Sequence, residues 1–319
     1  MFTPSSGENS ADMKQFFKFI FVLAIALFAS VQNAAATDDG GASNSLTTQH
    51  ALILGLVEGV TEYLPVSSTG HLFLAQRFMG IGDSGPEKDA ADSYAICIQA
   101  GAILAVLMLY FGRVRSIVRG VFGRDDRGRR IAINLSLAFL PTALTGIAFE
   151  NIIKTYLFGI WPITVAWFVG GIAILLMASR KNNPQCGYSI DDLSKRQAFL
   201  IGAAQCIAMW PGVSRSLVTI LGGVLVGLNL SGAVEFSFLL GLVTLSAATV
   251  FEGLQYGGQI IAVFGWLNPL VGMAVAFVSA AIAVKTMVAF LNRNAMVWFG
   301  IYRVILSAAV LAAIITGRI

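Results

Sequence analysis

The sequence predicts an all-α polytopic membrane protein, with about six transmembrane helices plus two re-entrant broken helices arranged as an inverted repeat. Of the 319 residues, 56% are hydrophobic and only 12% are charged, which is about half the charged fraction of a soluble domain. Polar motifs interrupt two of the apolar segments. Irregular backbone at membrane depth is tolerated only where it is packed in protein or lines a wet cavity, so these two interruptions are candidate sites.

The charge balance indicates membrane topology and gives no reason to expect a nucleic-acid partner. The net charge of +4 is modest, and it comes largely from basic residues in predicted loops. The three cysteines have neither metal-ligand spacing nor a disulfide pattern, and we interpret them as small hydrophobic residues. The partner expected from composition is the lipid bilayer.

Residues 1–46 form a signal-peptide-like extension in front of a single membrane domain at 47–319. Two lysines precede an apolar run at 19–29, and small residues supply a cleavage point near Ala36. The run is too short for an ordinary membrane span, although an uncleaved anchor stays open. Cleavage would leave the mature N-terminus on the outer face.

The first predicted element of the domain is a broken re-entrant helix with halves at 51–63 and 71–79. Pro65 removes a backbone donor and disfavours helix at the residue before it. Glu58 and Glu62 lie four residues apart and share one helix face. Each carboxylate costs roughly 2.5–3.5 kcal/mol at the bilayer centre, so their presence predicts a functional site.

Six apolar segments have the length of about twenty residues that a membrane span needs. They cover roughly 93–111, 131–150, 161–179, 232–252, 267–291 and 296–316. The loop at 112–130 holds seven arginines against two aspartates, and the loop at 180–196 holds four basic residues, so both are expected in the cytoplasm. The acidic loop at 81–92 and the short loop near 151–160 are then expected outside.

The second broken segment, at 198–223, repeats the first. Ala51, Gly55, Glu58 and Tyr63 match Ala198, Gly202, Gln205 and Trp210, and after a one-residue gap the run Pro65–Ser68 matches Pro211–Ser214. Because three spans separate the two segments, the repeat halves at about 47–180 and 195–319 enter from opposite sides. Inverted repeats of this kind aim two half-helix N-termini at an anionic group near the midplane.

The two motifs together favour phosphate-ester or diphosphate chemistry. Arg215 lies between two serines at a predicted helix start, which suits a phosphate oxygen. The carboxylates of the first motif would repel a phosphate unless one is a base or a divalent cation bridges them. Transport of a lipid phosphate uses the same features and stays an alternative. A histidine-nucleophile mechanism is disfavoured, because the second histidine besides His71 is His50, before the first helix.

The runs Glu58–His71 and Pro211–Ser216 closely resemble the bacterial undecaprenyl-diphosphate phosphatases of the bacitracin-resistance protein family, and the resemblance covers essentially 47–316. It implies hydrolysis of undecaprenyl diphosphate to undecaprenyl phosphate and inorganic phosphate, which recycles the lipid carrier of cell-wall synthesis. It also implies Mg²⁺ or Ca²⁺ as a cofactor, a multi-pass location in the bacterial inner membrane and an active site facing the outer, periplasmic side. Because such proteins are often dimers, a homodimer is a further expectation.

The resemblance also implies roles at individual positions. The catalytic candidates are Glu58, Glu62, Ser68, His71 and Arg215, and the substrate-binding candidates are Ser67, Thr69, Ser214, Ser216 and Thr219. Glu58 and Glu62 are the metal candidates, with Glu62 the stronger choice for a base or metal contact. Ser68 matches a serine proposed as nucleophile or phosphate contact, and attack by a covalent serine or by water stays open.

Two positions depart from the pattern of this family, and four candidates also have a structural interpretation. Leu217 stands where a glycine is common, which narrows the backbone approach to a phosphate, and Ala95 stands where a glutamate is common. The structural interpretations concern polar residues that can cap a half-helix. They apply to His71, Ser67, Thr69 and Thr219.

Overall fold

The computed structural model describes residues 46–82, 85–179, 186–289 and 293–317, which are almost entirely helical and contain no β-sheet. The helices are α2 (Thr48–Thr61), α3 (Ser68–Phe78), α4 (Gly85–Cys97), α5 (Gln99–Leu109), α6 (Phe111–Val121), α7 (Asp126–Tyr156), α8 (Ile160–Ser179), α9 (Lys195–Gln205), α10 (Arg215–Leu225), α11 (Leu230–Phe264), α12 (Leu267–Ala289) and α13 (Arg293–Ile315). Two short 3₁₀ helices are η1 (Ile190–Asp192) and η2 (Cys206–Met209). The signal-like extension and its cleavage point near Ala36 lie outside the described residues.

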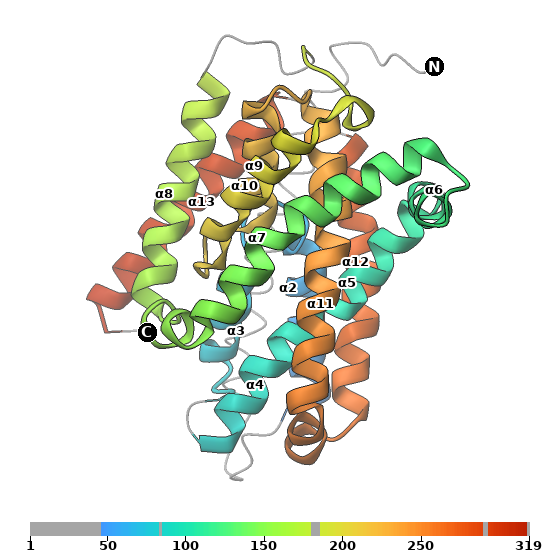
Figure 1. The fold of residues 1–319 in the computed structure, drawn as a ribbon. Coiled ribbons are helices and arrows are strands. Elements are labelled where there is room, and N and C mark those ends of the chain that lie inside the picture. The colour runs from blue at the N-terminus through green and yellow to red at the C-terminus, as the bar shows by residue number, and fades with distance from the viewer. Residues whose placement is uncertain (1–45, 83–84, 180–185, 290–292, 318–319) are drawn as a thin grey trace.

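Six helical segments of the described chain are long and apolar enough to cross a membrane. They are Glu87–Leu109, Asp126–Phe149, Ile160–Ser179, Leu230–Phe264, Leu267–Ala289 and Met296–Ile315. This confirms the predicted all-α polytopic class and the predicted number of spans. Figure 1 shows α8 beside α13 on one side of the bundle, α11 and α12 on the other, and the half-helices between them.

Several predicted loops are wrong in detail because helices continue through them. The expected acidic loop at 81–92 contains the first turns of α4, and the expected basic loop at 112–130 contains α6. Helix α7 runs on to Tyr156, and α11 continues to Phe264, past the predicted end at residue 252. Amphipathic helices outside the bilayer core lack the long apolar run by which a span is recognised, so the sequence pattern did not separate them from loops.

The two broken segments form two helix pairs that are shorter than a membrane span, α2–α3 and α9–α10, and the members of each pair pack on each other. The half-helices α3 and α10 are preceded by Ser67 and Ser214, with φ of 74° and 79°. Among the described residues, these are the only positions other than glycine with positive φ. Such conformations cost of order 1–3 kcal/mol and cluster at functional sites.

These two serines correct the alignment of the repeat. Ser67 and Ser214 are 147 positions apart, as are Glu58 and Gln205, so the repeat needs no gap and the predicted one-residue gap is wrong. In the corrected register, Ser68 corresponds to Arg215. The two repeat halves therefore place a hydroxyl and a guanidinium at equivalent first positions of their half-helices.

The packing of the half-helices follows the same repeat. Helix α2 packs along α12, and its counterpart α9 packs along α7. A Cβ added at Gly55 would collide with the carbonyl of Gly272, and a Cβ added at the equivalent Gly202 would collide with the carbonyl of Ala138. Small residues allow this close approach of membrane helices. Three spans separate the two pairs, so the repeat is inverted.

Candidate active site

The two re-entrant loops meet at the start of α10. The hydroxyl of Ser216 donates to the carbonyl of Leu64 at 2.8 Å. The fully buried guanidinium of Arg303, on α13, donates to the carbonyls of Pro65 at 3.3 Å and of Gly212 at 2.8 Å. Pro65 and Gly212 are equivalent positions of the repeat, so the guanidinium of Arg303 binds the same backbone carbonyl in each of the two loops.

Three candidate side chains come together at this junction. The hydroxyl of Ser68 donates to Oε2 of Glu62, and Nη2 of Arg215 lies 3.3 Å from Oε1 of the same carboxylate. Glu62 and Arg215 are both largely buried. A serine hydroxyl that donates to a carboxylate is the arrangement of a nucleophile beside its base, and the guanidinium next to it supplies a phosphate-binding fork.

Arg215 is oriented by groups from α11 and from the turn after α2. Its Nη1 donates to the carbonyl of Ser237 at 2.9 Å, and its guanidinium lies 5.4 Å from the ring centroid of Tyr63. Gly241 makes room for it, because a Cβ there would contact the guanidinium at 2.5 Å. The Nε atom is buried without a hydrogen-bond partner in the described part of the chain, so one donor is left for a ligand.

A cavity of about 150 Å³ lies at this junction. Six of the ten candidates line it, namely Glu62, Ser67, Ser68, Thr69, Ser214 and Arg215. The other four candidates, Glu58, His71, Ser216 and Thr219, are not among its lining residues. The cavity is therefore built from the first positions of both half-helices, as the inverted repeat predicts.

Three of the four candidates outside the cavity are bonded to protein groups. His71 pairs through Nδ1 with the carbonyl of Ser67 at 2.6 Å and through Nε2 with the hydroxyl of Tyr302 at 2.7 Å. The hydroxyl of Thr219 pairs with that of Ser237 at 2.6 Å, and Ser216 is bonded as described above. These contacts hold the backbone of the site in place. Direct contact of these three residues with the substrate stays a prediction.

Glu58 is fully buried one helical turn before Glu62. Both of its carboxylate oxygens are buried without a hydrogen-bond donor among the described residues. Oxygen donors of this kind suit Mg²⁺ or Ca²⁺, and Mg²⁺ is commonly held by one or two carboxylates plus phosphate oxygens and waters. The described residues contain no group of three or more His, Cys, Asp or Glu side chains placed to hold a metal, so Glu58 and Glu62 fit a cation only as part of such a mixed set.

The sequence patterns missed other groups of the site. Arg303 lies inside a predicted span, and a charged residue at membrane depth is itself a signal of function. Gln99 lines the cavity, and its Oε1 is buried without a hydrogen-bond partner in the described ranges. The carbonyl of Ser237, which binds Arg215, had no signal because backbone groups leave none in the sequence.

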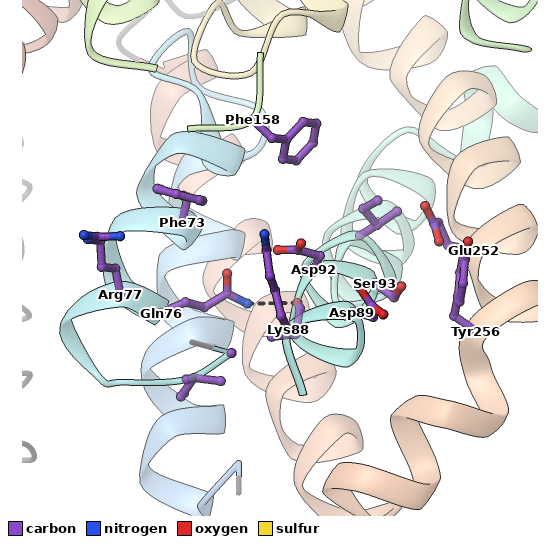
Figure 2. Close-up of a pocket in the computed structure, with 14 residues that line it drawn as sticks. Phe73, Gln76, Arg77, Lys88, Asp89, Asp92, Ser93, Phe158, Glu252 and Tyr256 are labelled. Carbon is purple, nitrogen blue, oxygen red and sulfur yellow. Dashed lines mark hydrogen bonds between the residues drawn. The ribbon is translucent and has the colours of Figure 1, made fainter. Parts of the chain in front are cut away.

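A second, larger cavity of about 500 Å³ lies along the same helical segments, α3, α4–α5 and α11. The smaller cavity is lined on these helices by Thr69, Gln99 and Leu245, and the larger one, one or two turns further along, by Phe73, Ile96 and Glu252. Figure 2 shows side chains of the three helices around the larger cavity, with Phe158 above it. The larger cavity therefore lies next to the candidate site on the same three helical segments.

Comparisons with known proteins agree with the geometry. Residues 51–309 match the family described as bacitracin resistance protein BacA. An undecaprenyl-diphosphatase of Sorangium cellulosum is 42% identical over 264 residues, covering 82% of this chain and 84% of the relative. One of Rhodopseudomonas palustris is 42% identical over 268 residues, covering 84% and 97%, and one of Deinococcus radiodurans is 39% identical over 274 residues, covering 84% and 96%. The chain belongs to the bacitracin resistance protein BacA family.

Proposed function

We propose that this chain is a membrane hydrolase that converts undecaprenyl diphosphate to undecaprenyl phosphate and inorganic phosphate. Its relatives are named for this activity. The observation that carries the proposal is the meeting of Ser68, Glu62 and Arg215 at one cavity. In a bacterial cell the reaction recycles the lipid carrier for peptidoglycan synthesis and thereby confers bacitracin resistance.

Arg215 binds the terminal phosphate. Its Nε, which is free of protein acceptors in the described chain, donates to a phosphate oxygen, and the backbone N–H groups at the start of α10 face the same anion. The hydroxyls of Ser67, Thr69 and Ser214 border the cavity and complete the shell of donors. This set of donors stabilises charge on the phosphoryl oxygens in the transition state.

Ser68 is the nucleophile in the proposed reaction, and Glu62 is its base. Glu62 accepts the Ser68 proton as Oγ attacks the terminal phosphorus, the bond from that phosphorus to the bridging oxygen breaks, and undecaprenyl phosphate leaves. Glu62 passes that proton to the departing undecaprenyl phosphate. A water then attacks the phosphoserine and gives a proton to Glu62, the bond from Ser68 Oγ to phosphorus breaks and inorganic phosphate leaves, and Glu62 returns the proton to Ser68 Oγ. The hydrogen bond from Ser68 to Glu62 supports this assignment over direct attack by water.

Glu58 and Glu62 hold the divalent cation in this proposal. The support is the buried Glu58 carboxylate, whose oxygens have no donor within the described residues. A bound Mg²⁺ or Ca²⁺ neutralises phosphate charge and removes the repulsion between the substrate and these carboxylates. Glu58 takes no part in proton transfer in this proposal, because the Ser68 hydroxyl donates to Glu62 and makes no hydrogen bond to Glu58.

The proposed location is the bacterial inner membrane, with the active site facing the periplasm. The arginine-rich α6–α7 connection marks the cytoplasmic end of the bundle. The larger cavity extends towards α4, at the opposite end of the bundle in Figure 1, so the diphosphate would enter from the outer face. Removal of the extension near Ala36 and a homodimer stay predictions.

The test is phosphate release from undecaprenyl diphosphate by the purified protein in detergent, with and without a chelator. We expect metal-dependent release that falls at least about 10³-fold in Glu62→Gln and Ser68→Ala, with a matched Ser136→Ala control, on the exposed side of α7, unaffected. Retained ³²P on Ser68 after rapid quenching supports the covalent path. Full turnover by Ser68→Ala would refute the covalent path. A wild-type protein that releases no phosphate with any divalent metal ion would refute the proposed hydrolase function.

The transport alternative finds no support in the names of the relatives. It predicts movement of labelled lipid between leaflets with both phosphates retained. Reconstituted vesicles that translocate intact undecaprenyl diphosphate, without releasing phosphate, would favour transport over hydrolysis.

A further inference from the structure

Helix α6 presents an amphipathic surface at the arginine-rich end of the bundle. Phe111, Val118 and Phe122 are 61%, 49% and 73% exposed. They are spaced by seven and four residues and share one helix face with Arg115, which is also exposed, as is Arg119 beside it. Large exposed apolar side chains interleaved with arginines are typical of a helix that lies in a membrane interface.

This surface is held rigidly. Helices α6 and α7 form a tight hairpin, because a Cβ at Gly120 would collide with the backbone of Arg129 and a Cβ at Gly128 with the carbonyl of Ser116. The Ser116 hydroxyl also donates to Asp125 at 2.6 Å. In Figure 1, α6 is seen nearly end-on while the spanning helices run along the bundle, so α6 lies roughly in the plane of the membrane.

Only part of the positive charge of the hairpin is balanced by protein groups. Arg113 pairs with Glu235 at 2.5 Å and with Asp191 at 3.4 Å, and Arg127 pairs with Asp191. These pairs fix the hairpin to α11 and η1. Four further arginines, all exposed, have no ion pair within the described residues. They are Arg115, Arg119, Arg124 and Arg130.

We infer that the exposed face of the α6–α7 hairpin binds anionic phospholipids of the leaflet in which it lies, the cytoplasmic leaflet in the orientation proposed above. The aromatic side chains enter the boundary between headgroups and acyl chains, and the arginines contact lipid phosphates bidentately. A basic residue near an anionic membrane surface strengthens binding by about fivefold. Two features specify this occupant: uncompensated positive charge and apolar side chains on the same face.

The test is native mass spectrometry of the full chain in micelles that contain equal amounts of phosphatidylglycerol and phosphatidylcholine. We expect the wild type to retain phosphatidylglycerol preferentially. The triple variant Arg115→Gln, Arg119→Gln, Arg124→Gln should lose at least fivefold of this preference, whereas Lys at the same positions keeps it. The control Lys195→Gln, Arg196→Gln removes charge from α9, outside the hairpin, and should lower the preference clearly less than the hairpin variant does.

Three results would overturn the inference. If the glutamine variant keeps the wild-type lipid preference, the hairpin arginines play no part in lipid binding. If the lysine variant loses as much of the phosphatidylglycerol preference as the glutamine variant, the substitutions act through altered packing and not through lost charge. If the α9 control loses as much of the preference as the hairpin variant, the preference depends on the total charge of the protein and not on the hairpin. Circular dichroism checks that all variants are folded, which the exposure of the substituted side chains leads us to expect.

Discussion

Arg303→Met tests the idea that one buried guanidinium aligns both halves of the site. Arg303 donates to four carbonyls, those of Ala166 and Gly212 at 2.9 and 2.8 Å and those of Pro65 and Trp167 at 3.3 Å. A hydrogen bond to a charged group contributes about 1.5–3 kcal/mol. Counting the two short bonds alone, Arg303→Met should lower the free energy of unfolding by about 3–6 kcal/mol.

The assay is thermal unfolding in detergent by circular dichroism, together with phosphate release at a temperature where the variant is folded. The loss corresponds to a fall in Tm of at least about 6 °C. Turnover should fall about 10²-fold or more, because the two loops that carry Ser68 and Arg215 lose their shared anchor and a displacement of about 1 Å is that costly.

Arg303→Lys is the informative companion. It keeps the charge, but an ammonium lacks the planar fork that reaches carbonyls of two loops, so we expect partial stability and low turnover. If Arg303→Met unfolds like the wild type and turns over substrate normally, the alignment role is refuted. If stability falls but the turnover of the folded fraction is normal, Arg303 stabilises the fold without positioning the site.

Three further predictions concern packing, capping and pH. Gly59→Ala places a methyl group against the α12 backbone and Ser279 and should destabilise the protein by about 1–3 kcal/mol. The control Gly253→Ala, in open space, should be neutral or stabilising by up to about 1 kcal/mol. Equal Tm values for the two variants would contradict the close packing of α2 on α12. Ser214→Ala removes the hydroxyl that caps α10 at the N–H of Leu217 and should cost about 0.5–2 kcal/mol, so an unchanged Tm would argue against the cap. The hydrogen bond from Arg127, together with the charges of Arg113 and Arg127, lowers the pKa of Asp191. The ionised Asp191 therefore stabilises the fold above its unfolded pKa of about 3.9, and this stabilisation is lost as pH falls through the lower folded pKa. Asp191→Asn should be less stable than the wild type at pH 7, with the difference shrinking in acid; a gap independent of pH would exclude this linkage.

The sequence identified the residues of the site better than their arrangement. Glu62, Ser68 and Arg215 were all expected, since polar residues inside apolar segments are conspicuous, and they meet at one cavity. The pairing of Ser68 with Glu62 across six residues could not be predicted, because it depends on the path of the loop after the first half-helix. The unusual φ of Ser67 and Ser214 likewise has no sequence signal, since local propensity disfavours positive φ at serine.

The sequence by itself determined the membrane class, the six spans and the two broken helices, because bilayer thickness dictates the length of an apolar run and proline and polar motifs mark its interruptions. Tertiary structure decided which of these polar groups meet. The register of the repeat, the binding of both loops by Arg303 and the cavity shared by Gln99 and Arg215 all join residues far apart in the chain. Such contacts depend on how helices pack, and apolar helices of similar composition leave many packings open until small residues such as Gly55 and Gly202 select one.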